Sequence, residues 1–230
     1  VLHGPGGSAS ARNSCQTTAR GRCSLRRITL DFGQSAAGGA AAVVAYLIGA
    51  SPDLGCDRAT LYGRVAGLAP AVARTGPWEA LRVLAIQARA AALAAHSPPA
   101  TRRAALALLS ALGHEATADA LVAAALEWHA ENPALDALLG APGPATVLAI
   151  ARRTAGQETP AAVHVKQLAV RLGAMVWRKV ADGVSVLGPA DARALALLAA
   201  EAPRRVPREV LVALAAHADP AARELARPRL

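Results

Sequence analysis

The strongest constraint on the fold is a helix start signal that recurs along the chain: a capping residue or a glycine directly before a proline. Proline fits the first position of an α-helix, where the backbone N–H has no partner, and Ser, Thr, Asp and Asn accept hydrogen bonds from the free N–H groups there. The signal precedes stretches of helical periodicity at Gly76-Pro77, Ser97-Pro98, Asn132-Pro133, Gly143-Pro144, Thr159-Pro160, Gly188-Pro189 and Asp219-Pro220. It predicts a chain of short helices.

The predicted helices cover most of the chain after residue 57. Asp57 is expected to cap a helix over 58–68 that Pro70 restarts, and Thr117 is expected to cap one over 118–131. The chain is 53% hydrophobic but only 3% aromatic, so helix-favouring Ala and Leu dominate and strand formers are scarce. The predicted fold class is therefore all-α. The remaining helices are expected at 77–96, 98–112, 133–139, 144–155, 160–182, 189–201, 207–217 and from 220 onward.

The helix starts recur with a period. One series begins at 77, 118, 160 and 207, and an interleaved series begins at 98, 144 and 189. Two helices per step of about 40–47 residues is the period of HEAT-type repeats. Residues 206–230 resemble a HEAT or leucine-rich-variant repeat, with Pro207 at the first helix start, a Leu-rich helix, Asp219-Pro220 opening the second helix and Arg223 inside it. The resemblance implies a HEAT-like right-handed α-solenoid of stacked helix pairs with a concave binding surface, but no particular activity.

The predicted helix over 160–182 is the best defined of the set. Thr159 can cap it and Gly183 can end it, and its broad apolar arc requires neighbouring helices on two sides. A narrow polar arc on its other side would form a basic ridge if the helix lined a concave face, where arginine can clamp carboxylates or phosphates of a partner. The alternative is a solvated face paired with nearby acidic residues. The candidate partner-binding residues are His164, Gln167, Arg171 and Arg178.

The first 35 residues carry the largest charge imbalance. The chain has a formal net charge of +9, and residues 1–30 contain no acidic residue but five arginines: Arg12, Arg20, Arg22, Arg26 and Arg27. Residues 1–35 show no helical or alternating periodicity, which predicts an extended basic N-terminal tail followed by a helical repeat domain over 36–230. Five cations along an irregular segment can neutralise successive phosphates, so RNA is the predicted partner of the tail.

Four basic doublets of the body suggest a different nucleic-acid contact. They would follow phosphates if they lay in line across the repeats: Arg102-Arg103, Arg152-Arg153, Arg178-Lys179 and Arg204-Arg205. They occupy different positions in their predicted helices, however, so a continuous stripe is not expected. Arg152-Arg153 also suits the C-terminal end of a helix dipole without any ligand.

The tail composition also bears on localisation. Segments rich in Arg and Ser and nearly free of acidic residues are typical of organelle transit peptides, which predicts a mitochondrion or plastid, with the cytoplasm as the alternative. Arg26-Arg27 and the uncharged run over 33–52 also resemble a twin-arginine signal, although Asp31 lies between them. The run is too rich in Ala and Gly for a membrane span. We expect residues 36–50 to form a helix buried in protein, with no membrane contact.

The chain carries no recognisable catalytic, metal or cofactor motif. It lacks HExxH, GxSxG and Walker sequences, and its histidines and three cysteines are dispersed. The prediction is a protein without enzymatic activity, cofactor, metal or small-molecule substrate. One enzymatic alternative remains, because HEAT-like folds resembling the alkylpurine DNA glycosylases use a basic groove with Trp and Asp. Trp177 and Asp182 lie near the end of the predicted helix over 160–182.

Three functional hypotheses follow. The first is a non-catalytic structural or adaptor subunit of a large ribonucleoprotein assembly, similar to the accessory proteins of organellar ribosomes, whose tail contacts RNA and whose helical body contacts neighbouring protein subunits. The second is a protein–protein adaptor that binds no nucleic acid. The third is a HEAT-like DNA glycosylase.

Overall fold

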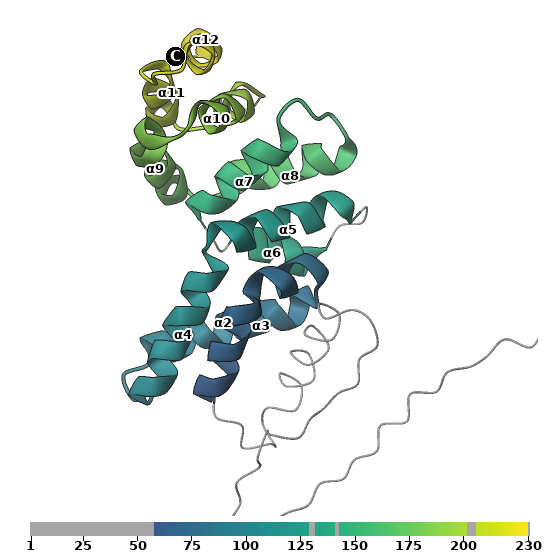
Figure 1. Ribbon diagram of the computed structural model, residues 1–230, viewed down its shortest axis with the longest axis vertical. Helices are drawn as coiled ribbons and strands as arrows, with labels where there is room; N and C mark the ends of the chain where they lie inside the picture. Colours follow the sequence, from purple (N-terminus) through teal and green to yellow (C-terminus); the bar gives the residue numbers. More distant parts are fainter. Residues whose placement is uncertain (1–57, 129–131, 141–142, 202–205, 230) are drawn as a thin grey trace, which may run out of the picture. The chain divides into compact units, whose positions relative to one another are not determined.

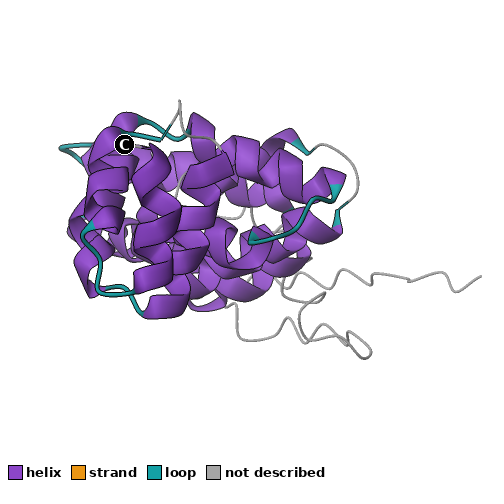
Figure 2. Ribbon diagram, turned by 90° about the horizontal axis from the view of Figure 1, so that it is seen from above, coloured by secondary structure: helices purple, strands orange, loops and turns teal. Residues whose placement is uncertain are grey.

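The computed structural model describes residues 58–128, 132–140, 143–201 and 206–229, all of which belong to one compact unit spanning 32–230. These residues form α-helices and two short 3-10 helices joined by loops, and no strand occurs among them (Figure 2). The predicted all-α class is confirmed. The tail over 1–35 and the helix predicted over 36–50 lie outside the described residues.

The helices lie close to their predicted positions, and α10 has the predicted bounds. Pro70 lies inside α2, so the predicted restart there is wrong and α2 is one continuous helix. In chain order the elements are α2 (Arg58–Thr75), α3 (Trp78–Leu93), α4 (Pro99–Leu112), α5 (Glu115–Glu127), α6 (Pro133–Gly140), α7 (Pro144–Thr154), α8 (Pro160–Arg171), α9 (Ala174–Gly183), η2 (Val184–Val186), α10 (Pro189–Glu201), α11 (Arg208–Ala215), α12 (Pro220–Ala226) and η3 (Arg227–Arg229) (Figure 1).

Side-chain caps form at several of the predicted starts. Thr159 accepts from the backbone N–H of Ala162 at 3.2 Å, and Asn132 accepts from two N–H groups of the first turn of α6. The predicted cap Thr117 is wrong. The helix begins at Glu115, two residues before Thr117, and its cap is His114, whose Nδ1 accepts from the N–H of Ala116. The Thr117 hydroxyl instead donates to a carbonyl of α4 at 2.7 Å.

The single helix predicted over 160–182 is two helices. Leu172 and Gly173 both adopt extended backbone angles, so α8 ends at Arg171 and α9 begins at Ala174. Glycine is a poor helix former because it loses the most backbone entropy when it is ordered. The break allows α8 to pack on α5, α6 and α7 while α9 packs on α7 and α11.

Helices that are not consecutive in the chain lie side by side and form two rows. The first helix row consists of α2, α5, α7, α10 and α12, in which each helix contacts the next (Figure 1). In the second helix row α3 contacts α6, α6 contacts α8, and, beyond the break, α9 contacts α11. The α4 helix packs mainly against α2 and α3.

The predicted series of helix starts is corrected by these contacts. The helix predicted to start at 118, observed as α5, contacts α2 and α7 and so belongs with α7 and α10, not with α3, α8 and α11. The α6 helix belongs to neither predicted series of helix starts. It nevertheless contacts both α3 and α8 in the second row. Spacing of helix starts therefore does not identify which helices are neighbours.

Alanine at the helix contacts lets the backbones approach closely. Many alanines are completely buried together with larger aliphatic side chains, and small residues at a contact reduce the distance between helix axes toward the lower end of the usual 8–10 Å range. Fully buried alanines include Ala88, Ala105, Ala118, Ala149, Ala162, Ala169, Ala192 and Ala199, and the largest buried aliphatic side chains include Leu81, Leu84, Leu108, Leu121, Leu135, Leu139, Ile150, Leu195 and Leu214.

Candidate interaction surface

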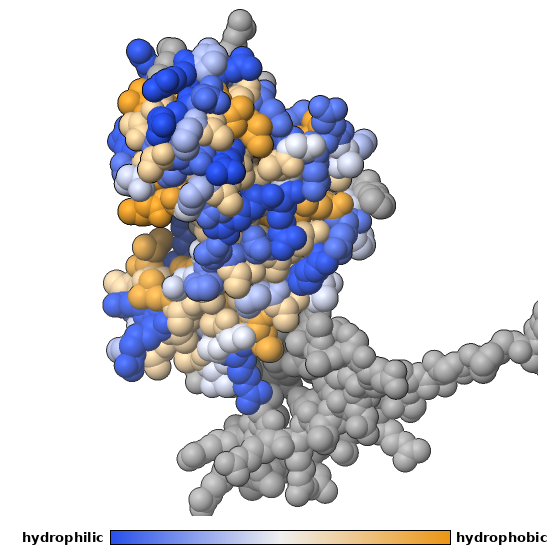
Figure 3. Space-filling view, turned by 45° about the horizontal axis from the view of Figure 1, so that its top comes forward, coloured by the Kyte–Doolittle hydropathy of each residue, from blue (hydrophilic) through white to orange (hydrophobic). Residues whose placement is uncertain are grey.

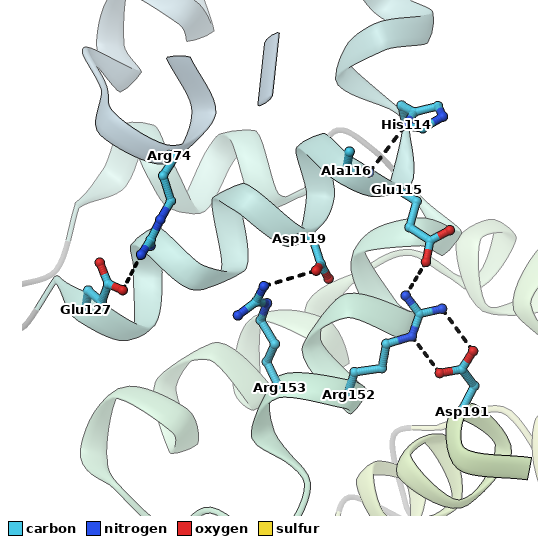
Figure 4. A network of polar contacts seen from close by, with 9 residues as sticks. All are labelled: Arg74, His114, Glu115, Ala116, Asp119, Glu127, Arg152, Arg153 and Asp191. Carbon is cyan, nitrogen blue, oxygen red and sulfur yellow. Dashed lines mark hydrogen bonds and ion pairs between the residues drawn. The ribbon is translucent and has the colours of Figure 1, made fainter. Parts of the chain in front are cut away.

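Arg152 on α7 joins three helices of the first row. Its Nε and one Nη donate to both carboxylate oxygens of Asp191 on α10, at 2.6 and 3.0 Å, and its other Nη contacts Glu115 on α5 (Figure 4). The side chain is 30% exposed. The hydrogen bonds that Arg152 donates to Asp191 raise the pKa of the Arg152 guanidinium, with a smaller contribution from the bond to Glu115. A bidentate pair of this kind fixes orientation as well as distance between α7 and α10.

Further ion pairs join the other consecutive helices of the first row. Arg74 of α2 contacts Glu127 of α5, and Arg153 of α7 lies 3.0 Å from Asp119 of α5 (Figure 4). Arg193 of α10 contacts Asp219, the residue that caps α12. We call this set the ion-pair ladder. Each neighbouring pair of helices in the first row is thus joined by at least one of its members: Arg74–Glu127, Arg152–Glu115, Arg153–Asp119, Arg152–Asp191 and Arg193–Asp219.

The ladder gives the Arg152-Arg153 doublet an internal role. Both guanidinium groups lie against carboxylates of neighbouring helices, so neither side chain is available to follow a phosphate backbone. The doublet also lies in the last turn of α7, where positive charge is favoured by the helix dipole. Arg102, from the other doublet, donates to the carbonyls of Ala94 and Ala95. Of the other two doublets, Arg178-Lys179 lies on α9 and Arg204-Arg205 lies outside the described residues.

Asp219 is the buried end of the ladder. Its side chain is 4% exposed, caps α12 by accepting from the N–H of Ala222 at 2.9 Å, and receives two hydrogen bonds from Arg193. The bond from Arg193 and then the backbone N–H of Ala222 lower the pKa of Asp219 to about 2. His217 holds the preceding turn, because its Nδ1 accepts from the N–H of Asp219 and its Nε2 donates to the carbonyl of Leu187.

The residues of the predicted polar arc lie on two helices. His164 Nε2 lies 3.3 Å from an Asp136 carboxylate oxygen and so joins α8 to α6 within the second row. Gln167 and Arg171 are exposed on α8, whereas Arg178 lies on α9 beyond the break at Gly173. The prediction that these four residues lie on one helix is therefore wrong, and their partner-binding role stays a prediction. The tail residues Arg12, Arg20, Arg22, Arg26 and Arg27 lie outside the described residues.

The helices α9 and α11, which pack against each other, both carry exposed charged and exposed apolar side chains. Met175 and Val212 are 63% and 51% exposed. Arg178, Lys179 and Arg208 form no ion pair with any described residue, nor do the neighbouring acids. We call this the α9–α11 surface; it consists of Met175, Arg178, Lys179, Asp182, Arg208, Glu209 and Val212.

The α9–α11 surface contains an open hollow of about 460 Å³. It is lined by three charged residues, one valine and three alanines: Asp182, Arg208, Glu209, Val212, Ala181, Ala213 and Ala216. On the face drawn in Figure 3, apolar residues of the protein lie in small groups between hydrophilic ones. Sequence reasoning found Arg178 but missed Arg208 and Val212. The available signal was that Arg208 and Val212 are four residues apart in a helix otherwise rich in buried aliphatic residues.

The residues of the enzymatic alternative do not share a site. Trp177 is 1% exposed and lies in the core, whereas Asp182 is exposed at the rim of the hollow. The two side chains therefore do not line one groove. Across the described ranges, no group of three or more His, Cys, Asp or Glu residues could hold a metal ion.

Comparison with known proteins identifies no relative: no family model, curated protein or solved structure matches the chain. Among the helices from α2 to α12, none is by itself long and apolar enough to cross a bilayer, although two bent pairs, α4 with α5 and α6 with α7, meet the length and composition requirements together.

The Arg152–Asp191 pair is expected to contribute measurable coupling between α7 and α10. In a double-mutant cycle of Arg152→Ala and Asp191→Ala, we expect a coupling free energy of about 1 kcal/mol, at the upper end for partly exposed pairs because the contact is bidentate. Chemical denaturation at low and high salt measures it, and the coupling should weaken with salt. Arg103→Ala, an exposed arginine of α4, is the control and should change stability by less than about 0.5 kcal/mol. A coupling near zero would contradict the role given to Arg152.

Asp219 makes the stability of the protein depend on acid pH. Because its folded pKa of about 2 lies below that of an unfolded aspartate, about 3.9, its ionised form stabilises the fold fully above the unfolded pKa. That contribution is lost as the pH falls through the folded pKa. Asp219→Asn keeps an oxygen for the cap but loses the charge, so we expect its melting temperature to fall less than that of the wild type between pH 5 and pH 2. If the melting temperatures of the wild type and the variant fell equally between pH 5 and pH 2, the Arg193 pair would not lower the pKa of Asp219.

Proposed function

We propose that this chain is a non-catalytic helical-repeat scaffold, in which residues 36–230 form a HEAT-like α-solenoid that holds a neighbouring protein subunit. Packing between non-consecutive helices in two rows supports the solenoid, because stacked helix pairs produce such contacts. Surfaces presented by stacked helices serve as extended binding sites in repeat proteins.

The proposal rests on a difference between two surfaces: charged side chains are paired along the first helix row and unpaired on the α9–α11 surface. Along the first helix row, acidic side chains lie in ion pairs that join one helix to the next. On the α9–α11 surface, charges of both signs remain without partners in the described part of the chain, beside exposed Met175 and Val212. Charged rims around apolar residues are the composition of protein interfaces. The charges of the first row are thus used within the protein, whereas those of the α9–α11 surface remain available to a partner.

A second contact, with RNA, is supported by the tail sequence. The five arginines and the absence of acid in residues 1–30 fit a segment that follows a phosphate backbone. With the body bound to protein and the tail to RNA, the chain would be a structural subunit of a ribonucleoprotein assembly of the organellar ribosome type. The transit-like composition of the tail favours a mitochondrion or plastid, with the cytoplasm as the alternative.

The protein contact can be tested by site-specific photo-crosslinking of the full chain in cells. A photoreactive amino acid at Met175 or at Val212 is expected to give a discrete protein adduct, because both side chains lie on the proposed interface. Leu106, an equally exposed apolar residue on α4, is the control position and should give several-fold less of that adduct. Equal labelling at all three positions would contradict a protein-binding role of the α9–α11 surface.

The RNA contact can be tested by charge removal in the full chain. Replacement of Arg12, Arg20, Arg22, Arg26 and Arg27 by glutamine is expected to abolish most binding of single-stranded RNA. If all five contact phosphates, the logarithm of the wild-type association constant should fall with the logarithm of salt with a slope of about −3.5. The control replaces five exposed body arginines, Arg64, Arg89, Arg103, Arg227 and Arg229, and should retain most of the affinity. An equal loss of RNA affinity in the two variants would contradict RNA binding by the tail.

A further inference from the structure

We infer that the uncharged segment over 36–50 packs against the exposed side of α3 and extends the second helix row by one member. The segment itself lies outside the described residues, whereas α3 is described. The inference rests on the solenoid part of the proposed function and names the contact that the first segment of the solenoid makes. Three observations carry it: an exposed apolar side of α3, the order in which the two rows alternate along the chain, and the composition and position of the segment.

The α3 helix has an apolar side that no described helix covers. Its buried residues, which include Leu81 and Leu84, lie on one side of the helix. Ile86 and Leu93 are 56% and 78% exposed, and at about 100° per residue both project from the opposite side. We call this side, which also carries the exposed Ala90, the outer face of α3. An apolar stripe of this kind along a helix is typical of a face that packs against another helix.

The order of the rows predicts a helix at the outer face. The first-row helix α7 lies in the chain between α6 and α8, which contact each other in the second row. The first-row helix α10 likewise lies between α9 and α11, which also contact each other. The first-row helix α2 is followed by α3, so by the same rule the segment before α2 would contact α3. In a row, this contact is on the side of α3 away from α6.

The segment before α2 has the composition that the outer face requires. It contains no charged residue, and Val44, Leu47 and Ile48 are spaced so that they share one face of a helix. At the N-terminal end of the outer face, Glu79 and Arg82 of α3 pair with each other, so they do not require a charged partner. An uncharged segment with an aliphatic stripe therefore fits the outer face in both charge and polarity.

The segment is also tethered within reach of α3. Residues 51–57 separate it from Arg58, the first residue of α2, and can span about 24 Å when extended. As a helix, residues 36–50 would be about 22 Å long, close to the length of about 24 Å expected for the 16 residues of α3. A short tether gives an effective concentration in the millimolar range, which favours this segment over a separate molecule at the same face.

Photo-crosslinking of the purified full chain tests the contact. A photoreactive amino acid at Leu93 is expected to give an adduct with a peptide from residues 36–50, identified by mass spectrometry after digestion. Val186 on η2, which is 84% exposed, is the matched control and should give several-fold less of this adduct. A mixture of isotope-labelled and unlabelled chains distinguishes adducts within one chain from adducts between two copies. The inference is overturned if Leu93 gives no more of the adduct than Val186, or if its adducts join two copies.

Hydrogen exchange provides the second measurement. Ile86→Asp/Leu93→Asp places charge on the outer face and is expected to accelerate amide exchange of residues 36–50 by about 10-fold, because an apolar helix packs poorly against carboxylates. Met175→Asp/Val212→Asp, at exposed positions of α9 and α11, is the control and should leave this exchange within about twofold. Thermal unfolding verifies that both variants fold. Equal exchange in the wild type and the outer-face variant overturns the inference.

Failure of the inference is distinguishable from failure of the proposed function. If residues 36–50 neither crosslink to Leu93 nor respond to the outer-face variant, while Met175 and Val212 still give a protein adduct in cells, the scaffold function stands. In that case the second row begins at α3. If the contact forms but Met175 and Val212 give no specific adduct, the segment extends the second row and the α9–α11 surface is not the interface.

Discussion

Close packing of alanine-rich helix faces is the interaction on which the rest of the structure depends. Alanine buries little apolar area itself, but it allows neighbouring leucine and valine side chains to fill the space between helices. Partly exposed ion pairs contribute only about 0.2–1 kcal/mol each, so the ladder alone could not hold the rows together. Its role is to select one register among the several that smooth alanine surfaces would accept, because the Arg152–Asp191 pair forms in only one.

The ladder also determines where charge remains available. The chain has more basic than acidic residues, and five acids of the first helix row are used in pairs between helices: Glu115, Asp119, Glu127, Asp191 and Asp219. Cations without such partners, including Arg178, Lys179 and Arg208, are left on other surfaces of the described residues. Stability and binding are thus connected, since the pairs that hold the framework decide which arginines can meet a partner.

Local chemistry accounts for what could be predicted. Proline at the first turn and a capping oxygen act within three or four residues, so the starts of α6, α8, α10 and α12 follow from the residues nearby. The break at Gly173 was missed because the apolar arc of residues 160–182 fits one helix as well as two. The break gives α8 and α9 different neighbours, since α8 packs on α5, α6 and α7 and α9 packs on α7 and α11. It also places Arg178 on a different helix from Arg171 and His164.

By itself, the sequence determined the helical class, most helix starts and the basic character of the tail, because each depends on residues close together in the chain. Tertiary structure alone decided which helices are neighbours, which arginines are paired and which are free. Arg74 meets Glu127 from 53 residues away and Arg153 meets Asp119 from 34 residues away. No periodicity encodes such distances, because they result from the way whole helix faces pack together.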